Sequence, residues 1–469
     1  MRQLSGIDAG FLSLETPDTP MTIAGLSVLD PATSDGPLTV DRLRRVVARR
    51  LDRIVAFRRR LASLPLDLAR PYWVEVPAAE IDLELHIEHT TLPEPGGWRE
   101  LSELMAWEIH RPFDRGRPLW QMVFVRGVRR LPGAPDEAVA LIGRVHHAAI
   151  DGVAGAEVLG ALFDGAGAPP AAPPRVEEEP AVPELLARAG RDLASLPFDA
   201  PRRAGRTLLS LAGGALGRRL RGAPRPPRPF SAPPTPFNTS VGPRRSWAPA
   251  FVALDRIRAV KSAEDATVND VVLAVCAGAL RSWLTERSAL PRRPLVAMVP
   301  VSVRSGDESG QAGNRVSAML VSLATDEPDP LLRLRKIRDA ARASKVTHQA
   351  VGARTLAESA ELLPFALSGA AARLYSRLHL AERHRPLFNL VITNVPGPPV
   401  PLSIAGARLL RHAGSAPLFD GLGLILPVFS YAGTVSFGVT ADREVMPDAA
   451  GFAARLEAAV EELERAVGV

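Results

Sequence analysis

The sequence predicts a mixed α/β fold built from two halves of similar size and class. In each half, short apolar or alternating stretches typical of strands are interspersed with longer stretches whose apolar residues repeat at helical spacing. Between the halves, residues 165–245 are rich in proline, which continues neither a helix nor a central strand. We therefore expect a domain at 1–165, a linker with amphipathic helices at 166–245, and a second domain at 246–469.

The first half combines one long helical pattern with several strand patterns. Between Thr39 and Leu61 the apolar residues are spaced to form one buried face, which predicts a helix over 39–61. The other elements expected in this half are strands at 72–76, 81–87, 119–125 and 138–145 and short helices at 98–109 and 157–163.

The second half repeats this mixture of patterns. Expected helices are 267–284, 331–343, 356–378 and 449–467. One strand is expected to begin at Phe251, and three more are expected at 295–303, 316–323 and 389–394. A late hairpin is expected from 421–429 and 433–439.

Composition excludes several classes of protein. The 469 residues are 46% hydrophobic and 23% charged, which is ordinary for a globular chain and excludes a mostly disordered one. The single cysteine, Cys276, excludes a disulfide framework, and a lone thiol with scattered histidines builds no zinc site. No uninterrupted apolar run reaches the roughly 18 residues expected of a transmembrane helix, and the N-terminus has no signal-peptide pattern. We expect a cytoplasmic protein without a bound metal or cofactor.

The positive charge is concentrated in one stretch. The net charge is +6, yet residues 201–245 alone contain ten arginines and no acidic residue. Such a stretch favours an anionic membrane or lipid-droplet surface, an anionic ligand such as a CoA ester, or nucleic acid. Nucleic acid ranks last, because no nucleic-acid-binding motif is present.

The motif most suggestive of chemistry is a histidine pair after an apolar strand pattern. His146 and His147 are followed by Asp151 and Gly152. A histidine at a strand end suits general base catalysis, because its ordinary pKa is near neutrality. Gly152 allows backbone conformations closed to other residues. A structural pair or a partial metal site would show the same spacing, although no third metal ligand is nearby.

The segment from His146 to Gly152 resembles the HHxxxDG signature of the CoA-dependent acyltransferase superfamily. Other motifs resemble those of bacterial wax ester synthase/diacylglycerol acyltransferases and occur in the expected order. They are LSGIDAGFL at 4–12, Pro118-Leu119-Trp120, NDVVLA from Asn269 and Asp270, PVSVR at 300–304, Gly313-Asn314, NVPGP from Asn394, and Ser430-Tyr431. Two features depart from the family pattern: Pro20-Met21-Thr22 replaces a PMH sequence, and the 165–245 stretch matches no family motif.

The resemblance implies a two-domain, chloramphenicol acetyltransferase-like α/β fold, with mixed sheets flanked by helices and an active site in a channel between the halves. It implies that acyl-CoA is a co-substrate and that no cofactor is bound. His147 would act as general base on the hydroxyl of diacylglycerol or a long-chain fatty alcohol, forming triacylglycerol or wax ester. His146 would support it. Asp151 would be a structural residue that pairs with an arginine.

For the remaining motif residues the sequence leaves alternatives open. The FRRRL sequence at 57–61 resembles the condensation-domain pattern that supplies the arginine partner, so the resemblance implies Arg60 as the partner of Asp151. Residues 58–60 could equally be a solvated helix end. Asn269 and Asp270 serve either the reaction or the start of a helix. Pro118, Leu119 and Trp120 are expected in the core or a pocket wall. Asn394 is expected at a strand end, and the resemblance implies that this end lies near the cleft.

Two other functions remain compatible with the sequence. One is a related HHxxxDG acyltransferase with a different acceptor or a carrier-bound acyl donor. The other is a non-catalytic lipid-binding protein of the same fold. Either way, peripheral attachment to the inner membrane or to lipid droplets is expected to involve the arginine-rich stretch.

Overall fold

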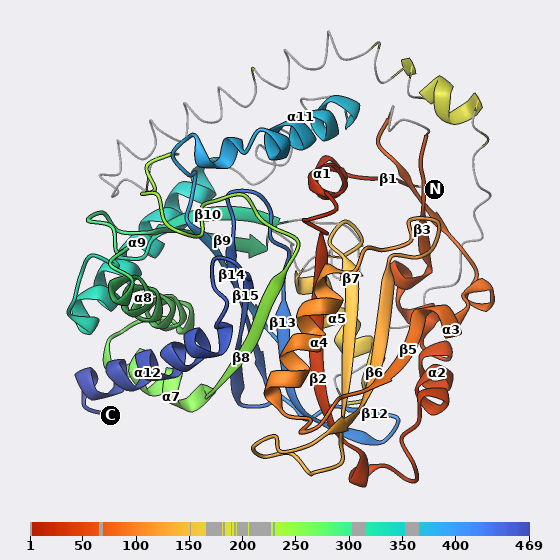
Figure 1. The fold of residues 1–469 in the computed structure, drawn as a ribbon, viewed down its shortest axis with the longest axis horizontal. Helices are drawn as coiled ribbons and strands as arrows, with labels where there is room; N and C mark the ends of the chain where they lie inside the picture. Colours follow the sequence, from red (N-terminus) through yellow and green to blue (C-terminus); the bar gives the residue numbers. More distant parts are fainter. Residues whose placement is uncertain are drawn as a thin grey trace.

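The computed structural model describes residues 2–64, 69–150, 152–165, 230–302, 316–351 and 365–469, with a few short pieces between 181 and 227. The strands in these residues form two mixed six-stranded sheets and one small three-stranded sheet. The two large sheets stand side by side in the middle of the molecule, with helices on their outer faces (Figure 1). The mixed α/β class that the sequence predicts is confirmed.

The sheet of the first half has the order β12-β13-β2-β7-β6-β5. Four of its strands come from the first half: β2 (Thr22–Asp30), β5 (Ile87–Thr91), β6 (Trp120–Val128) and β7 (Ala138–His146). The helices α2 (Val40–Ala48) and α3 (Leu83–His86) contact β5, whereas α4 (Trp98–His110) contacts β2 and β7. After β7 the chain enters α5 (Gly152–Leu162).

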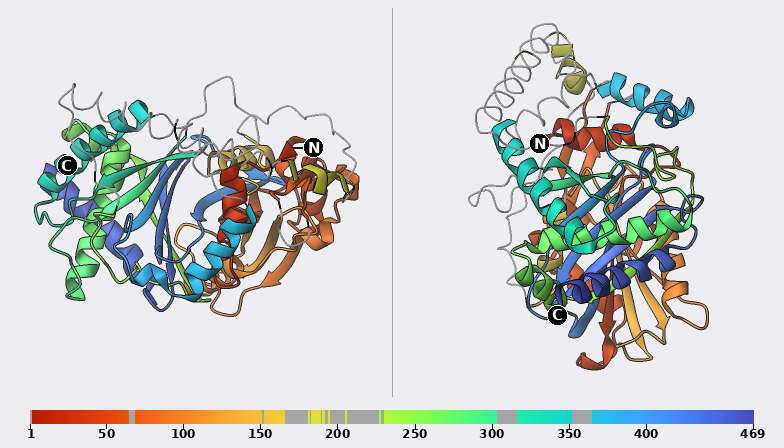
Figure 2. Two further views of the ribbon diagram at one scale, coloured as in Figure 1. Left: turned by 90° about the horizontal axis from the view of Figure 1, so that it is seen from above. Right: turned by 90° about the vertical axis from the view of Figure 1, so that its left-hand side faces the viewer.

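The sheet of the second half has the order β10-β9-β11-β14-β15-β8. Its strands are β8 (Arg245–Ala253), β9 (Val296–Ser302), β10 (Val316–Ser322), β11 (Leu390–Pro396), β14 (Leu424–Tyr431) and β15 (Thr434–Asp442). The helices around it are α7 (Leu254–Ala263), α8 (Val268–Glu286), α9 (Pro330–Val351) and α12 (Ala449–Val467). Figure 2 shows these four helices together on the outer side of this half. The buried side chains of α8 and α12 join those of the sheet in one apolar core.

The two sheets are joined by a strand that leaves its own half. β12 (Ser403–Ile404) and β13 (Ala407–Ser415) follow β11 in the chain, yet β13 pairs with β2 of the first half. β13 also contacts β14 and β15 of the second sheet. At this junction a Cβ atom on Gly438 would lie 1.8 Å from the backbone oxygen of Gly414. The close approach of the sheets therefore depends on glycine at this position.

A smaller layer covers the ends of the strands in the first half. β1 (Arg2–Gln3), β4 (Tyr72–Glu75) and β3 (Arg59–Ala62) form the three-stranded sheet. Beside it lie α1 (Gly6–Leu14) and α11 (Phe365–Arg377), which pack against each other. α11 thus belongs to the second half of the chain but lies over an element of the first (Figures 1 and 2).

Three of the expected elements are wrong in detail. The strand expected to begin at Phe251 is β8, which begins at Arg245 and ends at Ala253, where the chain enters α7. The helix expected over 39–61 ends at Ala48, and the chain continues through two 3-10 turns into β3. Leu51, Ile54 and Phe57 are still buried, because short turns can bury the same residues that a regular helix would. The strand expected over 81–87 is mostly the helical turn α3, whose first turn is capped by the Asp82 carboxylate accepting from the Glu84 amide.

One described helix, α8, is long and apolar enough to span a membrane, and 72% of its apolar window is buried inside the protein. The core of the second half accounts for this burial. Most of the expected linker, 166–245, lies outside the described residues, as do 356–364 of the helix expected over 356–378.

Candidate active site

The histidine pair lies at the end of the central strand β7 and is held there by backbone hydrogen bonds. The His146 amide donates to the carbonyl oxygen of Leu119 at 3.0 Å, and the His147 amide donates to that of Met21 at 2.7 Å. These two carbonyls belong to the residues just before β6 and β2, the strands on either side of β7. The chain then turns, with the Ala149 amide donating to the His146 carbonyl oxygen at 2.9 Å.

The His146 side chain is built into this turn. It is 1% exposed, and its Nδ1 accepts a hydrogen bond from the Ala148 amide at 3.0 Å. Because Nδ1 is the acceptor, the proton of the neutral ring is on Nε2. Nε2 lies 3.5 Å from Oε1 of Glu15. His146 therefore links the turn that carries His147 to a carboxylate at the end of α1.

Glu15 is a largely buried anion in this arrangement. Its carboxylate also pairs with the guanidinium of Arg115. Burial alone would raise the pKa of Glu15, but the hydrogen bonds and charges of His146 and Arg115 outweigh burial and lower that pKa to about 2. Glu15 is therefore ionised at neutral pH and faces the N–H side of the His146 ring.

The His147 ring stacks on Phe11 of α1. The two ring centroids are 3.8 Å apart and the planes differ by 14°. α1 starts at a well-defined point, because the Ser5 hydroxyl accepts from the Asp8 amide as an N-cap. Leu12 and Ala9 of this helix are buried in one cluster with Leu119 and Ala148. The cap and the cluster thus fix the helix that supports the His147 ring.

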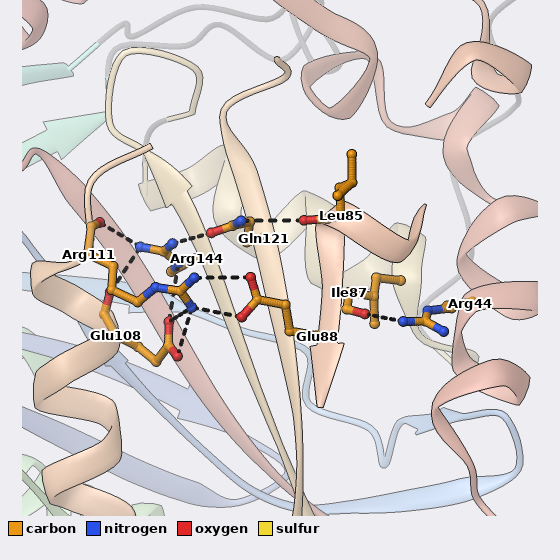
Figure 3. A network of polar contacts seen from close by, with 8 residues as sticks. All are labelled: Arg44, Leu85, Ile87, Glu88, Glu108, Arg111, Gln121 and Arg144. Atoms are coloured by element: carbon orange, nitrogen blue, oxygen red, sulfur yellow. Dashed lines mark hydrogen bonds and ion pairs between the residues drawn. The ribbon is translucent and has the colours of Figure 1, made fainter. Parts of the chain in front are cut away.

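A second polar network lies beneath the strand end (Figure 3). Arg144 of β7 is 1% exposed, and its guanidinium donates to the carbonyl oxygens of Glu108 and Arg111 and to the Gln121 side chain. Glu108 and Glu88 share Arg111 as a common ion-pair partner. Burial lowers the pKa of Arg144 to about 10, so it still carries a positive charge at neutral pH. The network anchors β7 to α4, β5 and β6.

A small pocket reaches the turn after the histidines. Arg2, Asp8, Arg59 and Trp73 line it from the three-stranded sheet and α1, and Ala148 and Ala149 line it from the turn. Its other lining residues are Gln3 and Ala56. No three His, Cys, Asp or Glu side chains within the described ranges are grouped to hold a metal ion.

Pro118, Leu119 and Trp120 lie where the backbone reaches the histidine pair. Trp120 is fully buried, stacks between Phe57 and His86, and donates from Nε1 to the Phe57 carbonyl oxygen at 2.9 Å. The Trp120 amide donates to the Pro118 carbonyl oxygen at 2.9 Å. The motif therefore fixes the start of β6, and its Leu119 carbonyl positions His146.

Two motifs of the second half meet each other. Nδ2 of Asn394 on β11 lies 3.3 Å from Oδ1 of Asn269, in the first turn of α8. Asp270 closes a capping box with Thr267: its carboxylate accepts from the Thr267 amide at 2.8 Å, and the Thr267 hydroxyl accepts from the Asp270 amide. Asp270 thus has the helix-capping geometry, while the Asn269–Asn394 contact ties α8 to β11.

The three arginines of the FRRRL sequence are not a solvated helix end. Arg58 is fully buried, with its Nε donating to the Leu51 carbonyl oxygen, and Arg59 and Arg60 belong to β3. Asp151 lies outside the described residues, so its pairing with Arg60 stays a prediction. Gly152 is the first residue of α5.

Comparisons with known proteins now add to this geometry. Residues 4–272 match the wax ester synthase/diacylglycerol acyltransferase catalytic domain, and residues 312–464 match the C-terminal domain of the same proteins. The chain belongs to this family. It is 35% identical over 465 residues to a Mycobacterium tuberculosis protein named as a diacylglycerol O-acyltransferase, covering 99% of this chain and 90% of that protein.

Solved structures agree with this assignment. The wax ester synthase/diacylglycerol acyltransferase of Marinobacter aquaeolei VT8 superposes with a TM-score of 0.68 at 29% identity, covering 100% of both chains. The first condensation domain of the CDA synthetase superposes with a TM-score of 0.58 at 16% identity, covering 99% of this chain and 95% of that one. The chloramphenicol acetyltransferase-like fold is confirmed, and the protein is an acyltransferase.

Within this family fold, Glu15 is the site residue that sequence reasoning missed. It directly follows the opening helix, but its contacts with His146 and Arg115 join segments that are far apart in the chain. No local spacing relates these residues. Only the pairing of β7 with β2, which begins seven residues after Glu15, brings the carboxylate to the histidine.

Replacing Glu15 with glutamine is expected to remove part of the acid sensitivity of the fold. A carboxylate whose folded pKa is about 2, against 4.5 when unperturbed, stabilises the fold above about pH 4.5 and loses that contribution as the pH falls toward 2. The contribution is up to about 3 kcal/mol. Urea unfolding from pH 7 down to pH 3 should show a shallower loss of unfolding free energy in Glu15→Gln than in wild type.

The matched control is Glu444→Gln, which removes an exposed carboxylate paired with Arg244 at 3.3 Å. Exposed ion pairs contribute little to stability, so this variant should follow the wild-type pH profile. If the unfolding free energies of Glu15→Gln and wild type fall in parallel as the pH is lowered, the pKa of Glu15 is not lowered in the folded protein.

Proposed function

We propose that the protein transfers the acyl group of an acyl-CoA to the hydroxyl of diacylglycerol or a long-chain fatty alcohol. The names of the similar proteins support these lipids as acceptors. The observation that carries the proposal is the placement of His147: its backbone is fixed at the end of β7 and its ring is held against Phe11.

In the proposed reaction His147 removes the proton from the acceptor hydroxyl as the oxygen attacks the thioester carbonyl carbon. A tetrahedral intermediate forms and collapses, the carbon–sulfur bond breaks, and the CoA thiolate takes up a proton. The transfer is direct and uses no acyl-enzyme. The only cysteine supports this, because Cys276 is buried in the α8 core and burial raises the pKa of its thiol.

His146 and Asp151 have supporting roles in this proposal. His146 holds the turn through its contact with the Ala148 amide, and Asp151 is proposed to orient the following segment by pairing with Arg60. Asn269, Asp270 and Asn394 shape the second half around the substrates through the contacts of α8 with β11. We also propose that the protein works at a membrane or lipid-droplet surface, where its lipid substrates and products reside.

The test is an assay with labelled palmitoyl-CoA and, in separate reactions, hexadecanol and dioleoylglycerol. We expect ester with at least one acceptor, and the ratio of wax ester to triacylglycerol sets the acceptor class. Palmitoyl carried on an acyl-carrier protein is the matched donor control and should be a much poorer substrate. A preference for the carrier-bound donor would favour the related carrier-dependent reaction, and no transfer to any alcohol would favour a lipid-binding role.

A further inference from the structure

Helix α11 presents an apolar stripe to solvent. Leu367, Leu374 and Leu378 are 59%, 55% and 44% exposed, which places them among the most exposed large apolar side chains in the described residues. They are spaced seven and four residues apart, two turns and one turn of helix, so they lie on one face. The turn that carries Leu378 continues the helix, because its amide donates to the Leu374 carbonyl oxygen at 3.0 Å.

The opposite face of α11 is the one that holds it to the protein. Phe365 is buried, and the hydroxyls of Ser368 and Ser13 lie 3.1 Å apart, joining α11 to α1. The helix extends along the periphery of the molecule, beyond the strand ends (Figures 1 and 2). The apolar stripe therefore faces away from the body of the protein.

Positive charge borders the stripe. Arg373 and Arg377 are exposed on α11, and the helix sequence FALSGAAARLYSR contains no acidic residue. In the segment after the helix, Arg383 and Arg385 are exposed as well, next to one exposed carboxylate, Glu382. An apolar stripe bordered by arginines is the pattern of a helix that lies in the interface of an anionic lipid surface.

We infer that α11 is the element that docks this protein on an anionic lipid surface. The position of α11 next to the candidate site supports a lipid surface, rather than another kind of partner, as what binds the apolar stripe. Phe365 of α11 is buried in one cluster with Leu119 and Ala148, and α1, on which α11 packs, carries the Phe11 ring that supports His147. A surface bound at α11 would therefore lie one helix away from His147. The inference rests on the proposed function, because the acceptor in that function is a lipid, which would enter the site from the docked surface.

The first experiment measures binding of the full chain to vesicles, without any measurement of catalysis. Flotation is carried out with phosphatidylcholine vesicles and with mixed phosphatidylcholine and phosphatidylglycerol vesicles. We expect stronger binding to the mixed vesicles and a decrease of that binding as salt is added. Replacing Leu367, Leu374 and Leu378 together with glutamine should lower the partition coefficient by about tenfold or more, because the apolar surface that enters the lipid is removed.

The matched control replaces three other exposed apolar residues, Leu85, Leu332 and Val400, with glutamine. It should bind as the wild type does. For charge, Arg373→Gln with Arg377→Gln should weaken binding to the mixed vesicles by about fivefold per arginine. The exposed pair Arg292→Gln with Arg293→Gln is the control. Circular dichroism establishes that every variant is folded.

Several outcomes would overturn the inference. Wild-type binding by the leucine variant would assign docking to another segment, such as the arginine-rich 201–245 stretch. An equal loss in the control set would mean that general surface apolarity drives binding. A leucine variant that changes from dimer to monomer in light scattering, with unchanged vesicle binding, would assign the stripe to contact between copies. Absence of vesicle binding by the wild type would reject docking while leaving the acyltransferase assay unaffected.

Discussion

Replacing His147 with alanine is expected to lower the rate of ester formation by about 10²–10⁴-fold, the usual contribution of a general base. The imidazole is the proposed acceptor of the hydroxyl proton, and alanine leaves nothing at that place to take it. The fold should persist, because the His147 backbone bond to Met21 does not involve the side chain. The measurement compares initial rates with labelled palmitoyl-CoA and the preferred acceptor.

His89→Ala is the matched control for this variant. His89 is an exposed histidine on β5, within the same sheet but away from the β7 turn. It should retain the wild-type rate. If folded His147→Ala protein forms ester at a rate within a few-fold of wild type, His147 is not the general base of the reaction.

Replacing Gly438 with alanine is expected to destabilise the fold by about 3 kcal/mol, the upper part of the range for an overpacked interior. The added Cβ would lie 1.8 Å from the Gly414 backbone oxygen, far inside van der Waals contact, and a backbone atom cannot swing away as a side chain can. The same oxygen accepts from Nε1 of Trp247 at 3.2 Å, so moving β13 also disturbs that bond. Urea unfolding measures the loss as a lower midpoint.

Gly143→Ala provides the matched comparison, since Gly143 is also a strand glycine but a Cβ there would meet nothing within 4 Å. Alanine restricts the unfolded chain more than glycine does, so this variant should be neutral or slightly stabilised. Equal urea midpoints for Gly438→Ala and Gly143→Ala would show that β15 and β13 make room for the added Cβ atom without loss of stability.

The sequence was sufficient for the fold class and family because those depend on local patterns and on the order of motifs. The closing helix is predicted at 449–467 and α12 has those bounds, since its apolar face and its Asp448 cap are both local. The strands at the histidine pair and at 72–76 were also found, because each is a short apolar stretch next to a turn signal.

Other features depend on contacts that no local pattern encodes. The helix expected over 39–61 fails because Leu51, Ile54 and Phe57 have the same spacing in successive 3-10 turns as on a helix. The pairing of Ser27 with His412 and the approach of Glu15 to His146 arise only after the sheets assemble. The candidate site was therefore predicted as far as its histidines, while the groups that hold them were found only in three dimensions.

The pairing of β13 with β2 has a consequence for the nascent chain on the ribosome. Until residues 407–415 have emerged, β2 is the edge strand of the first sheet. An unpaired strand edge is a template for pairing with other chains, and Leu26 and Val28 of β2, fully buried in the finished protein, would then lack part of their cover. This edge closes only after the whole stretch between β2 and β13 has been synthesised, so protection of the growing chain by chaperones matters more here than in a protein whose halves fold one after the other.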